Sequence, residues 1–342
     1  MSRFRILATI LVAVCVLATP LSAVPVPHAA WKLPTAVPNG SLWHKALLDM
    51  TAAWSKDTGG RVTATVFPNS SAGSEPGVVR NMRAGQFQAS LLMLSGLALI
   101  DDGFNALGIP FFFKNDEEAR AVQEALTPLL EKKINAKGFH LLAWTNGGWV
   151  QLFSKKQLKT LDEIKKAKLW TSAGDTRMTQ WYKTNGFNPQ EGEAKDVVPQ
   201  MKIGTIDATP SPSYIAQVTN LYRDAPFMLD IHVGPLLGGL VVTTAAWNAT
   251  SPEDQAKITA AAKVFEKSTS ASVPAQDNAS VGEMQKRGLT VTKMAPKDSA
   301  DLYAQIAKLV ASMRGDMVPA DMYDAAKSAL DAHRAKKPPV SR

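Results

Sequence analysis

Short apolar stretches alternate with longer stretches in which apolar residues recur at helical spacing. In the first third of the chain, strand-like residues 31–36 and 61–67 enclose a helical segment that Ser41 can cap. A serine hydroxyl suits this position because it accepts a backbone N–H at a helix start. A further helix is predicted over 75–83 and an apolar strand over 89–94. Strands that alternate with helices in this way indicate an α/β fold with largely parallel sheets.

The rest of the chain continues this alternation. Further helices are predicted at 116–136, 175–184, 194–203, 253–269, 297–313 and 320–335, and further strands at 139–144, 149–154, 168–172, 206–208 and 288–293. The apolar runs 221–231 and 237–244 should carry the chain back across a hinge. Pro252 suits a helix start, because a proline needs no hydrogen bond there. Pro274 should interrupt or end the same helix, since proline removes a backbone donor.

The first 23 residues have the pattern of a secretory signal peptide. Arg3 and Arg5 precede an apolar run at 6–18, and residues 21–23 (LSA) form a plausible cleavage site. The run is shorter than the ~20 residues of a membrane-spanning helix. We therefore expect export to the periplasm and no stable membrane insertion of the mature chain.

Composition agrees with a two-lobed protein that is stabilised by packing. The chain has 342 residues, more than one hydrophobic core comfortably supports, so two lobes are expected. Its single cysteine, Cys15, lies within the signal segment, which leaves the mature chain without a disulfide. The formal net charge of +8 is spread along the chain, without an arginine-rich arm or zinc-ligand spacing. Nucleic-acid binding therefore has little support.

Three phrases resemble the DctP-type solute receptors of tripartite (TRAP) transporters, which import small molecules through bacterial inner membranes. Residues 161–175 (LDEIKKAKLWTSAGD) resemble the family segment "sLeDlkGlKiRv". Residues 107–113 (LGIPFFF) resemble "l-x-l-P-f-l-f", and residues 198–207 (VPQMKIGTID) resemble "aLq-x-G-x-vDG". The phrases occur in the family's order, so the resemblance extends over the mature chain.

The resemblance implies an α/β fold of two lobes, like that of periplasmic binding proteins, with a hinge and an interlobe ligand cleft. It further implies a receptor that closes on a small organic solute, such as an organic acid, an aromatic or a sugar-like molecule, and delivers it to a small and a large membrane subunit. The predicted parts are a signal peptide (1–23), lobe I (31–149 plus about 238–275), lobe II (about 150–237 plus 276–335) and a disordered tail (336–342).

The family's ligand contacts map onto five positions of this chain. These positions are Trp149, Trp170, Ser172, Ser211 and Tyr214. The family has at position 170 an arginine that holds the substrate carboxylate, and it often has asparagine at 211. An indole offers one N–H and a large apolar face, whereas a guanidinium offers two parallel hydrogen bonds. A bidentate carboxylate clamp is therefore not expected here. Trp149 and Trp170 could instead belong to the core, because tryptophan is largely buried on average.

Two charged residues complete the set of candidates. Arg177, in the helix that follows the 161–175 phrase, could replace the missing arginine, or it could be a solvated helix residue. Glu75 stands at a helix start where relatives often contact the ligand, but a carboxylate there also stabilises the helix dipole.

Catalysis is the weaker class of function. The five histidines show no metal-binding pair, and neither a nucleophile elbow nor a Walker loop is present. Residues 101–103 (DDG) lack the alternating oxygen ligands of a calcium loop. We expect neither an enzyme, a metal nor a cofactor. Two alternatives remain open: a receptor that reports to a sensor kinase, and a periplasmic hydrolase or lyase.

Overall fold

The computed structural model describes residues 28–336, so the predicted signal peptide and residues 337–342 of the predicted tail lie outside the described residues. Its strands are β1 (Ala29–Pro34), β2 (Val62–Phe67), β3 (Ala89–Met93), β4 (Phe139–Ser154), β5 (Lys168–Ser172), β6 (Asn188–Gly192), β7 (Ala208–Pro212), β8 (Phe227–Thr243) and β9 (Thr290–Thr292).

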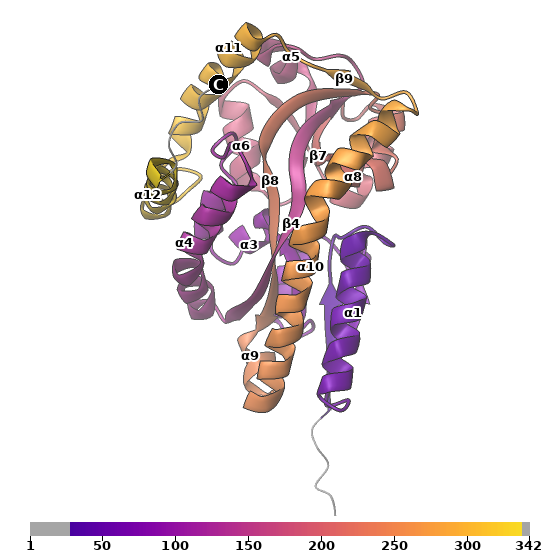
Figure 1. Cartoon of the computed structure of the whole chain (residues 1–342), viewed down its shortest axis with the longest axis vertical. Coiled ribbons are helices and arrows are strands. Elements are labelled where there is room, and N and C mark those ends of the chain that lie inside the picture. The colour runs from indigo at the N-terminus through magenta and orange to yellow at the C-terminus, as the bar shows by residue number, and fades with distance from the viewer. Residues whose placement is uncertain (1–27, 337–342) are drawn as a thin grey trace, which may run out of the picture.

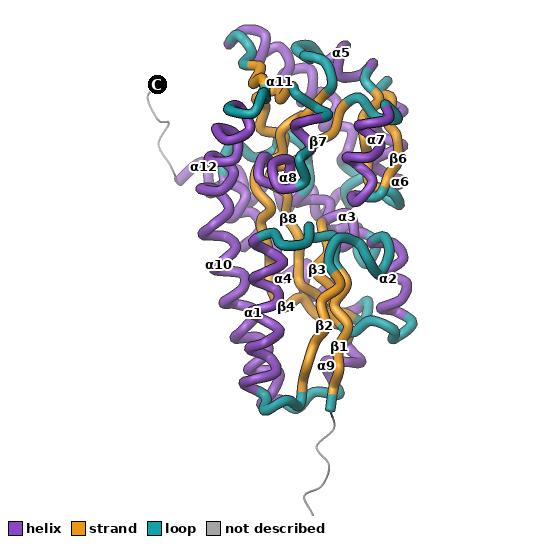
Figure 2. The backbone as a smooth tube through the Cα atoms, turned by 90° about the vertical axis from the view of Figure 1, so that its right-hand side faces the viewer, coloured by secondary structure: helices purple, strands orange, loops and turns teal. Residues whose placement is uncertain are grey.

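Helices connect and cover these strands (Figures 1 and 2). The α-helices are α1 (Leu42–Asp57), α2 (Glu75–Arg83), α3 (Leu94–Ala98), α4 (Asp116–Ala136), α5 (Leu161–Lys166), α6 (Thr176–Thr184), α7 (Val197–Ile203), α8 (Ser213–Val218), α9 (Thr244–Asn248), α10 (Pro252–Gln285), α11 (Pro296–Val310) and α12 (Ala320–Lys336). Short 3-10 helices are η1 (Asp102–Leu107), η2 (Ala194–Asp196), η3 (Leu221–Arg223) and η4 (Ala311–Met313).

One seven-stranded sheet runs through the whole molecule. Its order is β3-β8-β4-β7-β5-β6, with β9 paired to β8, and β1 and β2 form a separate parallel pair. The large sheet is mixed, so the prediction of largely parallel sheets holds only in part: β5 pairs parallel with β6 and β7, and β9 with β8, whereas β8 pairs antiparallel with β3 and β4, and β4 with β7. The antiparallel pairs arise because β4 carries the chain from one half to the other and β8 brings it back.

The two halves lie at opposite ends of β4 and β8 (Figure 1). We call the end with β1–β3 and α1–α4 the α1 half, and the end with β5–β7 and α5–α8 the α5 half. β4 has 16 residues and would span about 50 Å if fully extended. The register of β4 against β8 shifts between Asn146 and Trp149, near the middle of the strand. The sequence predicted 139–144 and 149–154 as separate strands, and they are one.

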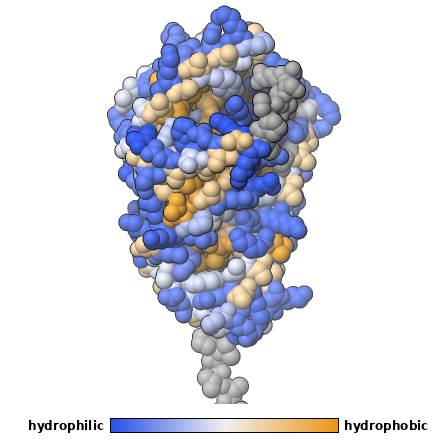
Figure 3. Space-filling model, turned by 60° about the vertical axis from the view of Figure 1, so that its left-hand side comes forward, coloured by the Kyte–Doolittle hydropathy of each residue, from blue (hydrophilic) through white to orange (hydrophobic). Residues whose placement is uncertain are grey.

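Apolar residues form three buried clusters around this sheet. One lies under α1 and α10 and includes Trp31, Trp54 and Phe265. A second extends from α4 into the α5 half, and the third, within the α5 half, includes Phe153 and Met201. On the face shown in Figure 3, hydrophobic areas are small and separated by hydrophilic ones.

Helix α10 runs along both halves (Figure 1). Pro252 starts it as predicted, with Ser251 accepting a hydrogen bond from the Asp254 backbone N–H. The prediction that Pro274 ends or interrupts this helix is wrong, since α10 continues to Gln285. A proline inside a helix costs about 3 kcal/mol. Contacts on both sides of position 274 offset that cost: Val273 is buried, and Asp277 bonds to the crossing strand.

The predicted elements around the 161–175 phrase agree with the structure, and others differ in detail. α5, β5 and α6 follow one another there, and Asp175 caps α6 by accepting the Met178 backbone N–H. The predicted strand at 206–208 begins only at Ala208, the predicted helix at 194–203 splits into η2 and α7, and β6 was not predicted. The lobe boundaries remain a prediction. α12, assigned to lobe II from sequence, packs on α4 through the Arg334–Glu118 pair.

Candidate functional site

A mainly apolar cavity of about 260 Å3 lies between the two halves, and we call it the interlobe cavity. The α1 half contributes Val37, Trp43 and Leu91 to its wall, and the α5 half contributes Trp170 and Val198. A small molecule in this cavity would therefore contact both halves at once. Mostly apolar walls with a few polar groups are typical of ligand sites in proteins.

Trp170 lies on β5 and is half-buried, with its ring on the cavity wall. Its indole Nε1 is buried and has no hydrogen-bond partner. Trp170 also packs against the cluster that contains Phe153 and Met201, so it contacts the core and the cavity together. A Cβ on Gly192 of β6 would lie 2.9 Å from the indole nitrogen, and Gly192 does not line the cavity, so the ring carbons are the part that faces a solute. This geometry favours packing against an apolar group over hydrogen bonding by the indole.

Hydroxyl groups supply part of the cavity's polarity. The Ser211 hydroxyl donates to the Pro212 carbonyl oxygen at 3.1 Å, so a backbone group already uses its proton. The Thr145 side chain is buried, lines the cavity, and has an Oγ1 without a hydrogen-bond partner. A buried hydroxyl without a partner costs free energy unless a ligand or water satisfies it. Thr145 thus has an unpaired hydroxyl oxygen beside the cavity, whereas the Ser211 proton is already used.

Lys195 is the one charged residue among the described residues that line the cavity. It follows the C-terminal end of β6, beside the end of β5. Its Nζ lies 3.4 Å from Glu193 Oε2, and its side chain is 44% exposed. No hydrogen bond joins the two groups, and Glu193 Oε2 has no other hydrogen-bond partner. The cavity therefore contains one cation that is only loosely paired.

A second recess of about 230 Å3 adjoins the interlobe cavity and shares Trp170 and Val150 with it. Ser172 and Asp175 line this recess. Burial raises the pKa of the Asp175 carboxyl, with the Met178 backbone N–H acting in the opposite direction. Ser172 and Trp170 therefore line neighbouring spaces, and their contact with a solute stays a prediction.

Glu75 lies behind the wall of the recess. Its carboxylate accepts hydrogen bonds from the Met93 backbone N–H at 2.7 Å and from the Ser95 hydroxyl at 2.9 Å, and both of those residues line the recess. Burial raises the pKa of Glu75 to about 7, although these hydrogen bonds act to lower it. Glu75 thus holds the chain between β3 and α3 in place, and it does not itself line either cavity.

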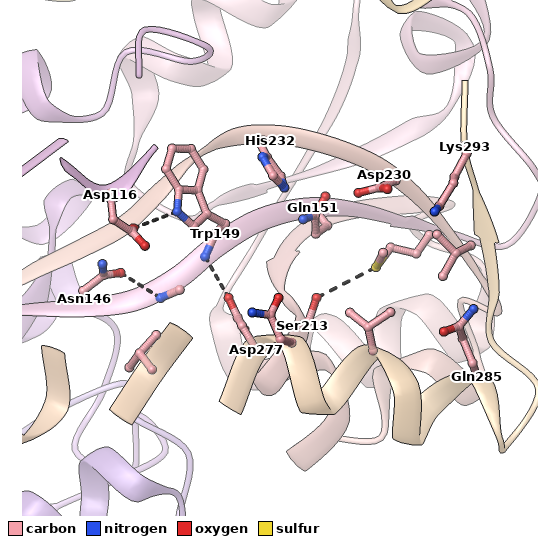
Figure 4. A pocket seen from close by; sticks show the side chains of 16 residues that line it. Asp116, Asn146, Trp149, Gln151, Ser213, Asp230, His232, Asp277, Gln285 and Lys293 are labelled. Carbon is pink, nitrogen blue, oxygen red and sulfur yellow. Dashed lines mark hydrogen bonds between the residues drawn. The ribbon is translucent and has the colours of Figure 1, made fainter. Parts of the chain in front are cut away.

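Trp149 lies on the opposite side of β4, in a polar cavity of about 420 Å3 that we call the hinge cavity (Figure 4). The indole Nε1 donates to Asp116 Oδ1 at 2.7 Å, and the ring packs on His232 at an interplanar angle of 40°, with 5.4 Å between centroids. Alternation along a strand explains this placement, since Val150 lines the interlobe cavity while Trp149 and Gln151 line the hinge cavity.

Asp277 of α10 joins the helix to both the crossing strand and α8. One carboxylate oxygen accepts the backbone N–H of Trp149 at 2.8 Å (Figure 4), and the other accepts that of Tyr214 at 2.9 Å. Gly148 makes room for it: its φ is +96°, and a Cβ there would lie 2.1 Å from Asp277 Oδ2. Only glycine accepts both constraints without strain. Asp277 is therefore an anchor of the hinge.

Tyr214, at the start of α8, contacts the α1 half. Its hydroxyl accepts the Leu42 backbone N–H at 3.2 Å, and its ring packs on Trp43 with centroids 5.3 Å apart. It does not line the interlobe cavity, although its contact Trp43 does. Tyr214 therefore joins the halves from behind the cavity wall.

Arg177 of α6 pairs with Asp102 of η1, with Nη1 and Oδ2 2.8 Å apart. Both side chains are partly exposed, and neither lines the interlobe cavity or the adjoining recess. The pair connects the α5 half to the α1 half at the surface. The structure thus places this arginine outside the cavity, where it contacts a carboxylate of the protein itself.

Of the seven candidates from sequence, the structure brings Trp170, Ser172 and Ser211 to the interlobe cavity and its recess. The others, Glu75, Trp149, Arg177 and Tyr214, lie behind, beside or across from it. Sequence reasoning missed Thr145 and Lys195. The signal for Lys195 was the short segment 188–192, which forms β6 parallel to β5. Because carboxyl ends of parallel strands meet at one sheet edge, the residues after β6 approach Trp170.

Within residues 28–336, no helix combines the length and apolar character that crossing a bilayer requires. Within the same range, no group of three or more histidine, cysteine, aspartate or glutamate side chains is arranged to hold a metal ion.

Known proteins are similar to this chain in sequence. The family of bacterial extracellular solute-binding proteins, family 7 (DctP), matches residues 33–316. An uncharacterized protein of Haemophilus influenzae is 25% identical over 213 residues, which cover 61% of this chain and 64% of the relative. The 2,3-diketo-L-gulonate-binding periplasmic protein YiaO of Escherichia coli is 24% identical over 210 residues, which cover 60% and 63%. The matches thus span less than two thirds of these two relatives.

Solved structures share the fold. A TRAP periplasmic solute-binding protein of Xanthobacter autotrophicus with bound β-D-galacturonate superposes with a TM-score of 0.80 at 19% identity, covering 88% of this chain and 99% of that one. DctP6 of Bordetella pertussis, a receptor binding pyroglutamic acid, gives 0.79 at 20% identity, covering 90% and 100%. The predicted two-lobe α/β architecture is therefore confirmed. On the family match over residues 33–316, this chain belongs to the bacterial extracellular solute-binding proteins of family 7, the DctP family.

Proposed function

We propose that this protein is the solute receptor of a TRAP-type transporter and holds one small organic acid in the interlobe cavity. One observation carries the proposal: the cavity of about 260 Å3 takes its walls from both halves, at the level where β4 crosses between them. A solute held there stabilises the closed form, because it contacts both halves only when they are together.

Contacts between the halves support closure as the mechanism. The Arg177–Asp102 pair joins α6 to η1. Gly174, with φ at +87°, lies against Pro76, and a Cβ there would lie 2.3 Å from the Pro76 Cγ. Each contact depends on the halves being close, so each adds to a solute's stabilisation of the closed state.

In this proposal the solute is released chemically unchanged. Family membership supports this, since the family consists of solute-binding proteins. The polar groups that line the cavity are chiefly hydroxyls, with the Asn69 amide and the Lys195 ammonium. Such groups bind and orient a small molecule.

The proposal includes the periplasm as location and a small and a large membrane subunit as partners. The DctP family match and the signal-like first 23 residues support both. The closed form would be the one that docks on the membrane subunits and releases the solute to them.

Mass spectrometry of the denatured protein, purified from its native periplasm, should identify a co-purifying organic acid. Re-addition of that acid to stripped protein should quench or shift tryptophan fluorescence, because Trp43 and Trp170 line the cavity. Small-angle scattering should report a smaller radius of gyration with the acid bound. Turnover of the acid, or binding without any closure, would contradict the proposal.

A further inference from the structure

The interlobe cavity combines one loosely paired cation with an otherwise mainly apolar wall. We propose that its solute is a monocarboxylate with an apolar, ring-sized body, whose carboxylate pairs with Lys195 while the body packs against Trp170. This inference rests on the proposed function and specifies its ligand.

Lys195 is the group that can bind a solute carboxylate. Lys195 is the cation among the described lining residues, and Trp170 presents ring carbons, because its Nε1 is buried. Arg177 is outside the cavity and bound to Asp102. A lysine ammonium is a point charge on a flexible stem, so it can pair with a carboxylate without the fixed geometry of a guanidinium.

Glu193 limits the charge of the solute. Its Oε2 lies 3.4 Å from Lys195 Nζ and makes no hydrogen bond, so the ammonium can turn toward a solute without breaking one. A single solute carboxylate then shares the ammonium with Glu193. A second solute carboxylate would find no other cation among the described lining residues and would be repelled by Glu193. The cavity wall therefore favours a solute with a single negative charge.

The remaining wall selects an apolar body. Val37, Leu91 and Val198 meet the rings of Trp43 and Trp170 around the cavity. A sugar acid would bring several hydroxyls into this space, and each buried hydroxyl needs a partner. Neither hydroxyl of the wall offers an open donor, because Thr145 Oγ1 is itself buried and the Ser211 hydroxyl already donates to the Pro212 carbonyl. The wall therefore favours a ring with one polar substituent over a polyol.

The volume agrees with this class. About 260 Å3 is below the usual range for drug-sized ligands, roughly 300–1,000 Å3, so the cavity holds one compact molecule. The adjoining recess on the other side of Trp170 extends the space for a substituent.

Isothermal titration of stripped full-length protein with phenylacetate, cyclohexanecarboxylate, their two amides and D-glucuronate tests the inference. At least one of the two acids should bind at least tenfold more tightly than glucuronate. Lys195→Met should weaken that acid at least tenfold and leave the matching amide within twofold. Glu193→Gln should strengthen the acid severalfold, because the ammonium loses its competing carboxylate. Lys202→Met, on the neighbouring helix α7 and outside the cavity wall, is the matched control and should change neither ligand.

Binding of neither ring acid, tighter binding of glucuronate, or an unchanged acid affinity in Lys195→Met would overturn the inference. Far-ultraviolet circular dichroism and melting curves confirm that each variant is folded. The proposed function fails separately: it fails if a solute that co-purifies from the periplasm is turned over or does not close the halves, whatever its chemical class.

Discussion

Strand β4 separates two cavities that differ in nearly every respect. On one side, the interlobe cavity is lined mainly by apolar residues and contains Lys195 as its charge. On the other, the hinge cavity is lined by charged and polar side chains of both signs, namely Asp116, Asp230, Asp277, His232, Lys293 and several amides. Neighbouring residues of the same strand, Val150 and Trp149, face the two sides.

The polar groups of the two cavities also differ in what they bond. In the hinge cavity, Asp116 and Asp277 accept hydrogen bonds that join β4 to α4, α8 and α10. Gln151 Oε1 is an exception, because it has no partner there. In the interlobe cavity, Thr145 Oγ1 has no hydrogen-bond partner, and Lys195 Nζ lies 3.4 Å from Glu193 Oε2 without a hydrogen bond. The comparison teaches that polarity alone does not mark a ligand site: groups that protein bonds leave free are better candidates.

The largest effect should come from breaking the hinge anchor. Asp277→Ala leaves the backbone N–H groups of Trp149 and Tyr214 without their acceptor. Hydrogen bonds to a charged group contribute roughly 1.5–3 kcal/mol each, so we expect a loss of about 3 kcal/mol of unfolding free energy, measured by urea denaturation. The melting temperature should fall by roughly 5 °C or more.

Asp230→Ala is the control for this prediction. Asp230 lines the same cavity and is exposed, so its removal should change the unfolding free energy by less than about 0.5 kcal/mol. Equal effects of the two substitutions would show that the cavity's overall charge, and not the anchor, sets its stability.

Glu75 should make stability depend on pH in the direction opposite to a salt-bridged carboxylate. Its pKa is about 7 when folded, above the ordinary value of 4.5, so the folded protein holds an extra proton between these values. The free energy of unfolding therefore falls as pH rises from 4.5 to 7, by up to about 3 kcal/mol. Glu75→Gln should flatten this part of the profile, as urea denaturation at pH 5, 6, 7 and 8 would show.

The raised pKa values of Asp175 and Asp277 contribute in the same direction, so some slope should remain in the variant. Parallel profiles of the wild type and Glu75→Gln would mean that Glu75 is ionised with its ordinary pKa.

Particular residues show which parts of the fold and of the site can be predicted from sequence. Residues 161–175 predicted α5, β5 and the start of α6 correctly, because helix caps such as Asp175 depend only on neighbouring residues. Sequence misjudged what depends on distant contacts: α10 continues through Pro274 because the crossing strand holds it, and the direction of β4 and β8 depends on which half each enters. In the site, Trp170 was found through a motif. Trp149 lies in the other cavity because its position relative to Val150 decides which face it takes.

The effect of Trp170→Ala on solute affinity should show which of the two cavities holds the solute. Loss of its ring from the interlobe wall should weaken solute binding about 10- to 100-fold, which corresponds to about 1.4–2.7 kcal/mol. Trp149→Phe removes the hydrogen bond to Asp116 in the hinge cavity and should leave affinity within about twofold. Titration calorimetry with the co-purified solute would measure both. The reverse order of effects would place the solute on the hinge side of β4.

The smallest effect concerns the surface pair between the halves. Arg177 and Asp102 have side chains that are 51% and 39% exposed, and pairs of this kind contribute about 0–1 kcal/mol. Because the pair joins the halves, Arg177→Ala should weaken solute binding by at most about threefold, and 0.5 M salt, which screens the pair in the wild type, should narrow the difference between the two proteins. Arg120→Ala, which breaks an exposed pair within α4 alone, should leave affinity unchanged. A tenfold loss confined to anionic solutes would instead make Arg177 a direct ligand for the carboxylate, and Lys195 would lose that role.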